Sequence, residues 1–226
     1  MAEILYEDNH LIAVYKKVSD LAQADKTGDT PIEREVKEYI ARKYNKPGDV
    51  FLGCVHRIDR PVSGVLLFAR TSKALARMNE IFRERQVKKM YYAIVKENPP
   101  EEKGTLTHFL KKNEKQNKSY AYDTEVKNSK KASLSYKIIG RSERYYLLEI
   151  ELHSGRHHQI RAQLAKIGCP IKGDLKYGYS RSNDDGGISL LARKLEFIHP
   201  VKKEPVAITA HLPEGDIWKL FVNSLG

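Results

Sequence analysis

The segment RYYLLEIELH, residues 144–153, alternates apolar and polar side chains with a period of two. Successive side chains of a β-strand point to opposite faces, so the alternation predicts a strand with one buried face. The buried face would carry Tyr146, Leu148, Ile150 and Leu152, and the other face Glu149 and Glu151. This segment therefore predicts a sheet that packs one of its faces against a core.

Other short apolar runs predict further strands, several of them spaced as hairpins. Two fall within residues 3–17 around a turn at Asp8 and Asn9, and the rest at 64–70, 89–97, 105–110, 133–139, 191–200 and 205–213. Strands outnumber helices in this reading. The predicted fold class is α+β, a mixed, largely antiparallel β-sheet with packed helices.

Four segments have the spacing of helices, at residues 30–45, 71–85, 157–168 and 216–225. The first two have candidate caps, Thr30 followed by Pro31, and Thr71 followed by Ser72. Their apolar stripes would be Ile32, Val36 and Ile40 in one and Leu75, Met78 and Phe82 in the other. In the third, Ile160, Leu164 and Ile167 form the stripe, and Gly168 ends the helix. By contrast, the polar stretch 111–131 predicts a mobile basic loop.

The charge balance favours a polyanionic partner. The chain has 40 Lys and Arg against 29 Asp and Glu, a net charge of +11, although a solvated basic surface explains the charge alone equally well. No apolar stretch approaches the ~20 residues of a membrane-spanning helix, and the N-terminus lacks the pattern of a signal peptide. We therefore expect a cytoplasmic protein with no membrane partner.

The usual motifs of metal, nucleotide and serine chemistry are missing from the sequence. His153, His157 and His158 cluster without metalloprotease spacing or a cysteine partner, so we expect no metal. There is no P-loop, GxGxxG or GxSxG, and Cys54 and Cys169 stand far apart. Carboxylate chemistry is the class that these exclusions leave.

Asp59 is the best placed carboxylate for such chemistry. In HRIDRPVSGVLLFAR it lies between Arg57 and Arg60, just before an apolar strand. Neighbouring cations favour the charged form of an aspartate, which can act as a nucleophile or as a base. A structural salt bridge explains the same local pattern, and taken alone the segment favours that reading.

Three segments together closely resemble the RluA-type RNA pseudouridine synthases. They are HRIDRPVSG, the K-x-Y-x-A pattern at Lys89, Tyr91 and Ala93, and GRHHQIR at residues 155–161. They occur in the family's order, and the resemblance extends from about residue 4 to residue 211. It implies a fold with one pseudouridine synthase catalytic domain over residues 1–226, without an S4 domain.

The resemblance implies a reaction and roles for individual residues. Uracil is detached from the ribose C1′, turned and rejoined through C5, so no atoms are gained and we expect no cofactor. Asp59 would act at C1′ as nucleophile or at C2′ as base, with Arg161 holding its carboxylate by paired hydrogen bonds. Tyr91 would serve the C5 proton, and adjacent Tyr92 would point to the opposite face of the strand. Both could be core aromatics, but the K-x-Y-x-A register favours the role of Tyr91.

The remaining family positions would bind the substrate. Arg57 would fill the place of the extracted uridine and Arg60 would face a phosphate. The other expected substrate-binding residues are His56, Lys89, Arg156, His158, Gln159 and Leu190. The chain departs from the family where its KPxG motif reads Lys16-Lys17-Val18-Ser19, and where Leu191 replaces a histidine. Both departures bear on substrate choice.

The expected partner is a structured RNA, an rRNA or tRNA stem-loop, bound by a monomer. Two rival functions stay open from sequence. One is a non-catalytic RNA-binding or chaperone module on the same fold, which the charge supports. The other is a hydrolase that uses Asp59 with a metal held by the histidines, and insensitivity to a chelator would remove it.

Overall fold

A computed structural model describes residues 2–23 and 28–224, in which the chain forms two units of strands and helices. The first unit consists of the chain up to Lys88 together with Ala192–His211. The second consists of Lys89–Leu191 and the segment that follows from Leu212. The predicted α+β class with a largely antiparallel sheet is confirmed.

The sheet of the first unit has the strand order β1-β2-β4-β10, with β3 paired to β4 and β11 paired to β10. β1 and β2 form the expected hairpin, in which Asp8 Oδ1 accepts hydrogen bonds from the backbone N–H groups of His10 and Leu11 at 2.8 Å each. The strands are β1 (Glu3–Glu7), β2 (Leu11–Lys16), β3 (Gly53–Cys54), β4 (Ser63–Ala69), β10 (Leu190–Ile198) and β11 (Pro205–Thr209).

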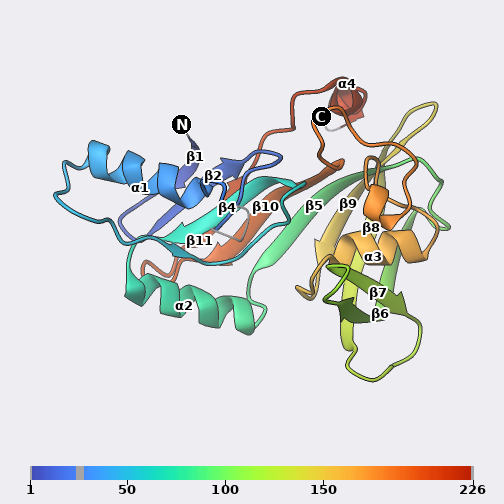
Figure 1. Cartoon of the computed structure of the whole chain (residues 1–226), viewed down its shortest axis with the longest axis horizontal. Helices are drawn as coiled ribbons and strands as arrows, with labels where there is room; N and C mark the ends of the chain where they lie inside the picture. Colours follow the sequence, from blue (N-terminus) through green and yellow to red (C-terminus); the bar gives the residue numbers. More distant parts are fainter. Residues whose placement is uncertain (1, 24–27, 225–226) are drawn as a thin grey trace. The chain divides into compact units, whose positions relative to one another are not determined.

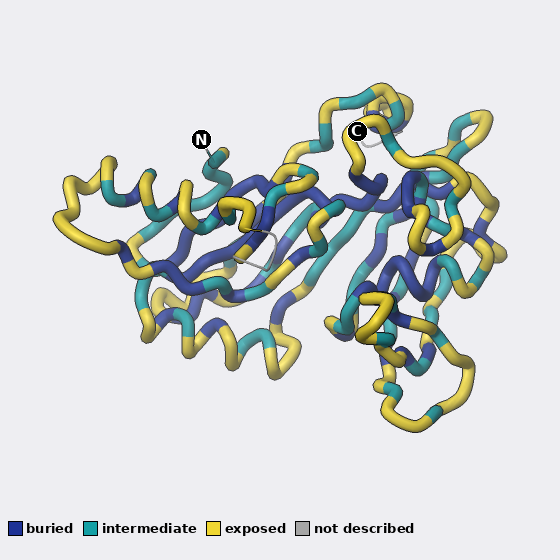
Figure 2. The backbone as a smooth tube through the Cα atoms, viewed as in Figure 1, coloured by how far each residue is buried: buried dark blue, intermediate teal, exposed yellow. Residues whose placement is uncertain are grey.

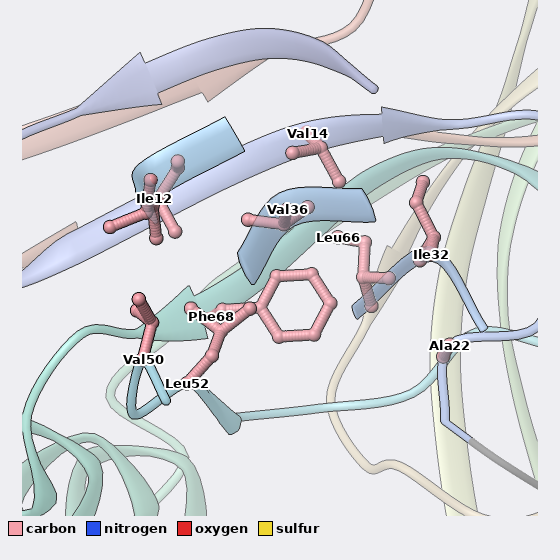
Figure 3. Close-up of a cluster of buried hydrophobic side chains, with 10 residues drawn as sticks. Ile12, Val14, Ala22, Ile32, Val36, Val50, Leu52, Leu66 and Phe68 are labelled. Carbon is pink, nitrogen blue, oxygen red and sulfur yellow. The ribbon is translucent and has the colours of Figure 1, made fainter. Parts of the chain in front are cut away.

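Helix α1 (Ile32–Lys43) covers one face of this sheet (Figure 1). Its apolar stripe packs into a core cluster with alternate residues of β2 and β4 (Figure 3). The predicted stripe is confirmed, with Ile32, Val36 and Ile40 all buried. The predicted cap is wrong, because Pro31, extended at φ −73° and ψ 150°, is the N-cap residue and makes no side-chain cap.

Helix α2 (Ser72–Arg83) begins as predicted. Thr71 Oγ1 accepts a hydrogen bond from Ala74 N at 3.1 Å, which satisfies one of the free N–H groups of the first turn. Its buried residues are Ala74 and Met78, while Leu75 and Phe82 are half-buried.

The second unit holds an antiparallel sheet with the strand order β5-β9-β8-β6-β7. Helix α3 (Gln159–Lys166) packs its Ala162 against Leu110 and Ala132 on one face of this sheet. The strand predicted at residues 146–152 is present, and Leu148 and Ile150 are buried as expected, whereas Tyr146 and Leu152 are half-buried and Leu147 is also fully buried. The strands are β5 (Lys88–Val95), β6 (Lys103–Asn113), β7 (Lys118–Tyr122), β8 (Lys130–Arg141) and β9 (Tyr146–Leu152).

The prediction of one continuous loop at residues 111–131 is wrong, because residues 111–113, 118–122 and 130–131 are strand. β6 runs on to Asn113 and turns back as β7, with Lys111 paired to Tyr120. Asn113 Oδ1 accepts a hydrogen bond from Gln116 N at 3.1 Å, and Asn117 has φ +44°. Asparagine favours both features, so the two residues make a tight turn.

The predicted closing helix at residues 216–225 is also wrong in length. The chain forms one short turn, α4 (Asp216–Lys219), and then the 3₁₀ turn η2 (Val222–Ser224), and Leu225 lies outside the described residues. Phe221, Val222 and Asn223 beyond the turn are weak helix formers, so the local sequence favours little further helix. None of the helices within residues 2–23 and 28–224 is long and apolar enough to cross a membrane.

Candidate active site

The segment with Asp59 is an irregular stretch that leads into β4. Arg57 is exposed, Ile58 is buried and Asp59 is half-buried, so the alternation expected of an extended segment is present. Val62 N donates to the carbonyl oxygen of Asp59 at 3.0 Å, so a turn follows Asp59 directly. Gly64 next to it has φ +121°, and a Cβ there would collide with the backbone of Ala192. The glycine of the motif is thus needed for close backbone packing.

Lys16 stabilises this turn by hydrogen bonds to its backbone carbonyl groups. Its side chain is fully buried at the end of β2, and its Nζ donates to the carbonyl oxygens of Lys17, Arg60 and Val62 at 3.0, 3.0 and 2.7 Å. Burial lowers the pKa of Lys16 to about 8, against the opposing effect of the charges of Asp20 and Asp59. Sequence reasoning treated Lys16 only as the end of a strand.

His56 and Arg60 also make contacts within the first unit. His56 Nε2 accepts a hydrogen bond from Leu67 N at 3.2 Å, and its ring stacks on Phe82 with centroids 5.3 Å apart. These contacts tie the segment to β4 and α2. Arg60 Nη2 lies 2.6 Å from Asp29 Oδ2 in an exposed ion pair. The ion pair leaves the expected phosphate contact of Arg60 a prediction.

Arg161 in the second unit forms a buried ion pair with Asp174. Its Nε lies 2.7 Å from Asp174 Oδ2 and its Nη2 lies 2.8 Å from Oδ1, a bidentate arrangement. The two side chains are 5% and 1% exposed, so the pair is held out of water. A buried, bidentate carboxylate fixes the plane of the guanidinium. Asp174 was missed as a functional residue, although it lies in the quoted segment IKGDLKYG.

His158 links Arg161 to Tyr177. Arg161 Nη1 can only donate, so His158 Nε2, 3.1 Å away, must accept, and Nδ1 carries the proton that is donated to Tyr177 Oη at 3.0 Å. Tyr177 Oη also accepts from Ser119 N at 2.8 Å and donates to Ser119 O at 3.1 Å. Burial and the charge of Arg161 lower the pKa of His158 to about 2, which agrees with this neutral form.

Tyr91 lies on the side of its sheet that α3 covers. Register partners share a face of a sheet, and Tyr91 pairs with Ile150, which pairs with Tyr136. Tyr136 lies on the face of Ala132, against which α3 packs. Tyr91 and Arg161 are therefore on the same side of the second unit, and Tyr92 is on the other, as predicted.

The other expected substrate-binding residues also lie in the second unit. Lys89 Nζ packs against Gly155, where a side-chain Cβ, if one were present, would be 3.4 Å away. The K-x-Y-x-A and GRHHQIR motifs are therefore adjacent at this point. Arg156 Nε donates to Lys131 O at 3.3 Å. Gln159 Oε1 accepts from Ser154 Oγ at 2.7 Å, and its Nε2 donates to Ser133 O at 3.0 Å. Both ends of the Gln159 amide therefore form hydrogen bonds within the protein, and its contact with substrate stays a prediction.

Leu190 and Leu191 are both buried at the start of β10. The residue at the position of the family histidine is therefore an apolar core residue in this chain. In the part of the chain that is described, no three His, Cys, Asp or Glu side chains are grouped so that they could hold a metal ion.

Asp59 belongs to the first unit, whereas Tyr91 and Arg161 belong to the second. The structure brings Tyr91 and Arg161 to one side of the same sheet. The pairing of Asp59 with Arg161 and the catalytic roles of all three residues stay predictions.

Comparison with known proteins assigns the family. Residues 10–166 match the RNA pseudouridylate synthase family. The chain belongs to this family and is an isomerase that converts uridine in RNA to pseudouridine.

Several relatives match almost the whole chain. A tRNA pseudouridine synthase C of Haemophilus influenzae is 31% identical, over 100% of this chain and 98% of its own length. One of Vibrio parahaemolyticus is 28% identical over 96% and 92%. An uncharacterized RNA pseudouridine synthase of Bacillus subtilis is 30% identical over 93% and 68%.

Solved structures show the same fold. The human RNA pseudouridylate synthase domain containing 4 superposes with a TM-score of 0.79 at 21% identity, covering 99% of this chain and 92% of that one. The related human domain containing 1 has a TM-score of 0.73 at 20% identity, over 97% and 86%.

Proposed function

We propose that the RNA substrate is a tRNA. The observation that carries this proposal is that relatives named tRNA pseudouridine synthase C match this chain over nearly its whole length and theirs. An enzyme that reads RNA within its catalytic domain must do so through surfaces along its whole length. Similarity at both ends of the chain therefore supports a shared class of substrate over an rRNA target.

The proposed catalytic carboxylate is Asp59. It lies in a turn that Lys16 holds through two carbonyl oxygens, so its position is defined by buried hydrogen bonds. Cleavage of the bond from N1 to C1′ develops positive character at C1′, which a carboxylate stabilises. Asp59 acts either as nucleophile at C1′ or as base at C2′. The exposed Arg57 is proposed to fill the place of the extracted uridine.

Tyr91 and Arg161 are proposed to complete the chemistry. The guanidinium of Arg161 is fixed by Asp174 at Nε and Nη2 and by His158 at Nη1, and a fixed guanidinium is suited to orient a carboxylate. Tyr91 is half-buried on the same side of the sheet, where its hydroxyl can serve the C5 proton. The isomerisation gains and loses no atoms, so these residues need no cofactor.

We further propose that residues 1–226 work as one catalytic domain, as a monomer in the cytoplasm. A non-catalytic RNA-binding module on the same fold is the alternative. It is supported by the net charge of +11, and it has no need of Asp59, Tyr91 and Arg161 together.

Chemical mapping of pseudouridine in tRNA and rRNA tests the substrate. Total RNA from cells with the gene, without it, and with only the Asp59→Ala gene would be compared. A tRNA pseudouridine lost in the last two cell lines is the expected result. Loss of an rRNA pseudouridine with intact tRNA would overturn the tRNA proposal, and unchanged modification in both would favour the non-catalytic module.

A further inference from the structure

The sheet of the second unit has a face that lies opposite α3. Alternation along the strands puts every second residue of β6, β7 and β8 on this face, and register pairs these residues across the strands. At the end near β7 they are Phe109, Lys111, Tyr120, Tyr122 and Lys131, and further along Thr105, Thr107, Ser133 and Ser135. Figure 2 shows exposed residues along these strands.

Aromatic rings gather at one end of this face. Tyr122 pairs directly with Phe109, and Tyr120 pairs directly with Lys111. Paired side chains on one face lie about 5 Å apart at Cβ, so the rings of neighbouring strands adjoin. Tyr120 and Tyr122 are each 38% exposed, although a sheet buries such side chains where it can. The rings therefore form a partly solvent-exposed aromatic surface, called here the tyrosine platform (Phe109, Tyr120 and Tyr122).

The ring of Tyr120 is held in place. Its hydroxyl donates to Gln116 Oε1 at 2.5 Å, and Lys118 Nζ lies 5.4 Å from the ring centroid. A ring fixed by its own loop loses little conformational freedom when a flat ligand stacks on it. This end of the face is thus preorganised for stacking.

The charged side chains on the face of the platform are lysines. Lys111 and Lys131 share its face, and strands β6, β7 and β8 contain no acidic residue. Glu114 and Asp123 lie beyond the ends of these strands and pair with Lys112 and Lys166, and at the far end of the face Lys137 pairs with Glu149. Rings flanked by cations suit a ligand that has flat bases and a phosphate backbone.

We infer that the tyrosine platform binds unpaired nucleotides of the RNA, by stacking bases on Tyr120 and Tyr122 while Lys111 and Lys131 meet phosphates. This inference rests on the proposed function for its ligand class. The platform is a second contact for RNA, because Tyr91 and Arg161 lie on the side of the sheet that α3 covers. It holds a single-stranded part of the substrate and takes no part in the chemistry.

The test uses an eight-residue oligoadenylate, which offers stacking bases and no uridine to isomerise. Its binding would be followed by fluorescence anisotropy with the wild type, the Tyr120→Leu/Tyr122→Leu variant and the Tyr120→Phe/Tyr122→Phe variant. Stacking contributes about 1–3 kcal/mol per base, so the leucine variant should raise the Kd at least about tenfold. The phenylalanine variant keeps both rings and should stay within about twofold.

Phe51→Leu is the matched control, because Phe51 is an aromatic residue of the first unit and is 46% exposed. It should leave the Kd unchanged. In single-turnover assays at saturating enzyme, the leucine variant should isomerise tRNA at the wild-type rate. A wild-type Kd in the leucine variant would overturn the platform, as would a dimer in sedimentation that the leucine variant dissociates. Failure of tRNA to react with the wild type would overturn the proposed substrate and leave the oligoadenylate result standing.

Discussion

The side chain of Lys16 has no exposed surface, and its Nζ lies 2.7 Å from the carbonyl oxygen of Val62. The contact joins the end of β2 to the turn that follows Asp59, across 46 residues of sequence. Two further carbonyl oxygens, of Lys17 and Arg60, share the same ammonium. A buried charge is stable only when it is hydrogen-bonded in this way, so the turn and the lysine depend on each other.

This buried lysine should make stability depend on pH. Burial lowers its folded pKa to about 8 from the usual 10.5, so between these values the unfolded chain binds a proton that the folded chain releases. Stability then rises with pH through this window. Between pH 7 and 9.5, the unfolding free energy of the wild type should gain roughly 2 kcal/mol relative to Lys16→Met. Urea unfolding of both proteins at each pH measures it, and parallel pH dependences would refute the assignment.

The Arg161–Asp174 pair should show strong coupling. Asp174→Ala leaves a buried guanidinium without its carboxylate, which costs about 3–5 kcal/mol of stability. The double variant Arg161→Leu/Asp174→Leu leaves no buried charge and should lose clearly less than the sum of the two single leucine variants. Urea unfolding of the four proteins gives the coupling, with Asp174→Asn as a milder variant if the alanine protein does not fold. Additive losses would mean that the pair contributes nothing as a pair.

Tyr91→Phe should separate chemistry from packing. The ring and its place on β5 are kept, so the unfolding free energy should change by less than about 1 kcal/mol, whereas turnover should fall by at least about a hundredfold. Tyr92→Phe on the opposite face is the internal control and should keep its turnover. Near wild-type turnover in the Tyr91 variant would make this tyrosine a structural residue.

Local sequence patterns were sufficient to predict the strands and the helix that carry Tyr91 and Arg161. The period of two predicted β9 and a run of β-forming residues predicted β5, so the opposite sides of Tyr91 and Tyr92 followed from sequence. Helical spacing predicted α3, which carries Arg161. The SYAY alternation of β7 was equally readable, and it was missed because the many lysines around it suggested a loop.

Long-range partners could not be predicted in this way. Lys16 is the last residue of an apolar strand, where a lysine usually marks the exposed end. Only the pairing of β2 with β4 brings its side chain to the turn after Asp59. Asp174 lies 13 residues from Arg161 with no shared helix or strand, so no spacing rule joins them. Such contacts depend on tertiary packing, which a local pattern does not contain.

The central claim is that Asp59 is the catalytic carboxylate, and tritium release from 5-tritiated uridine tRNA tests it most directly. Asp59→Ala and Asp59→Asn should release no tritium above background, while binding tRNA at least as tightly as the wild type, because a negative charge has been removed beside a polyanion. The Asp49→Ala protein, which lacks an exposed carboxylate of the same unit, should release tritium normally. Measurable release by Asp59→Ala would contradict the account.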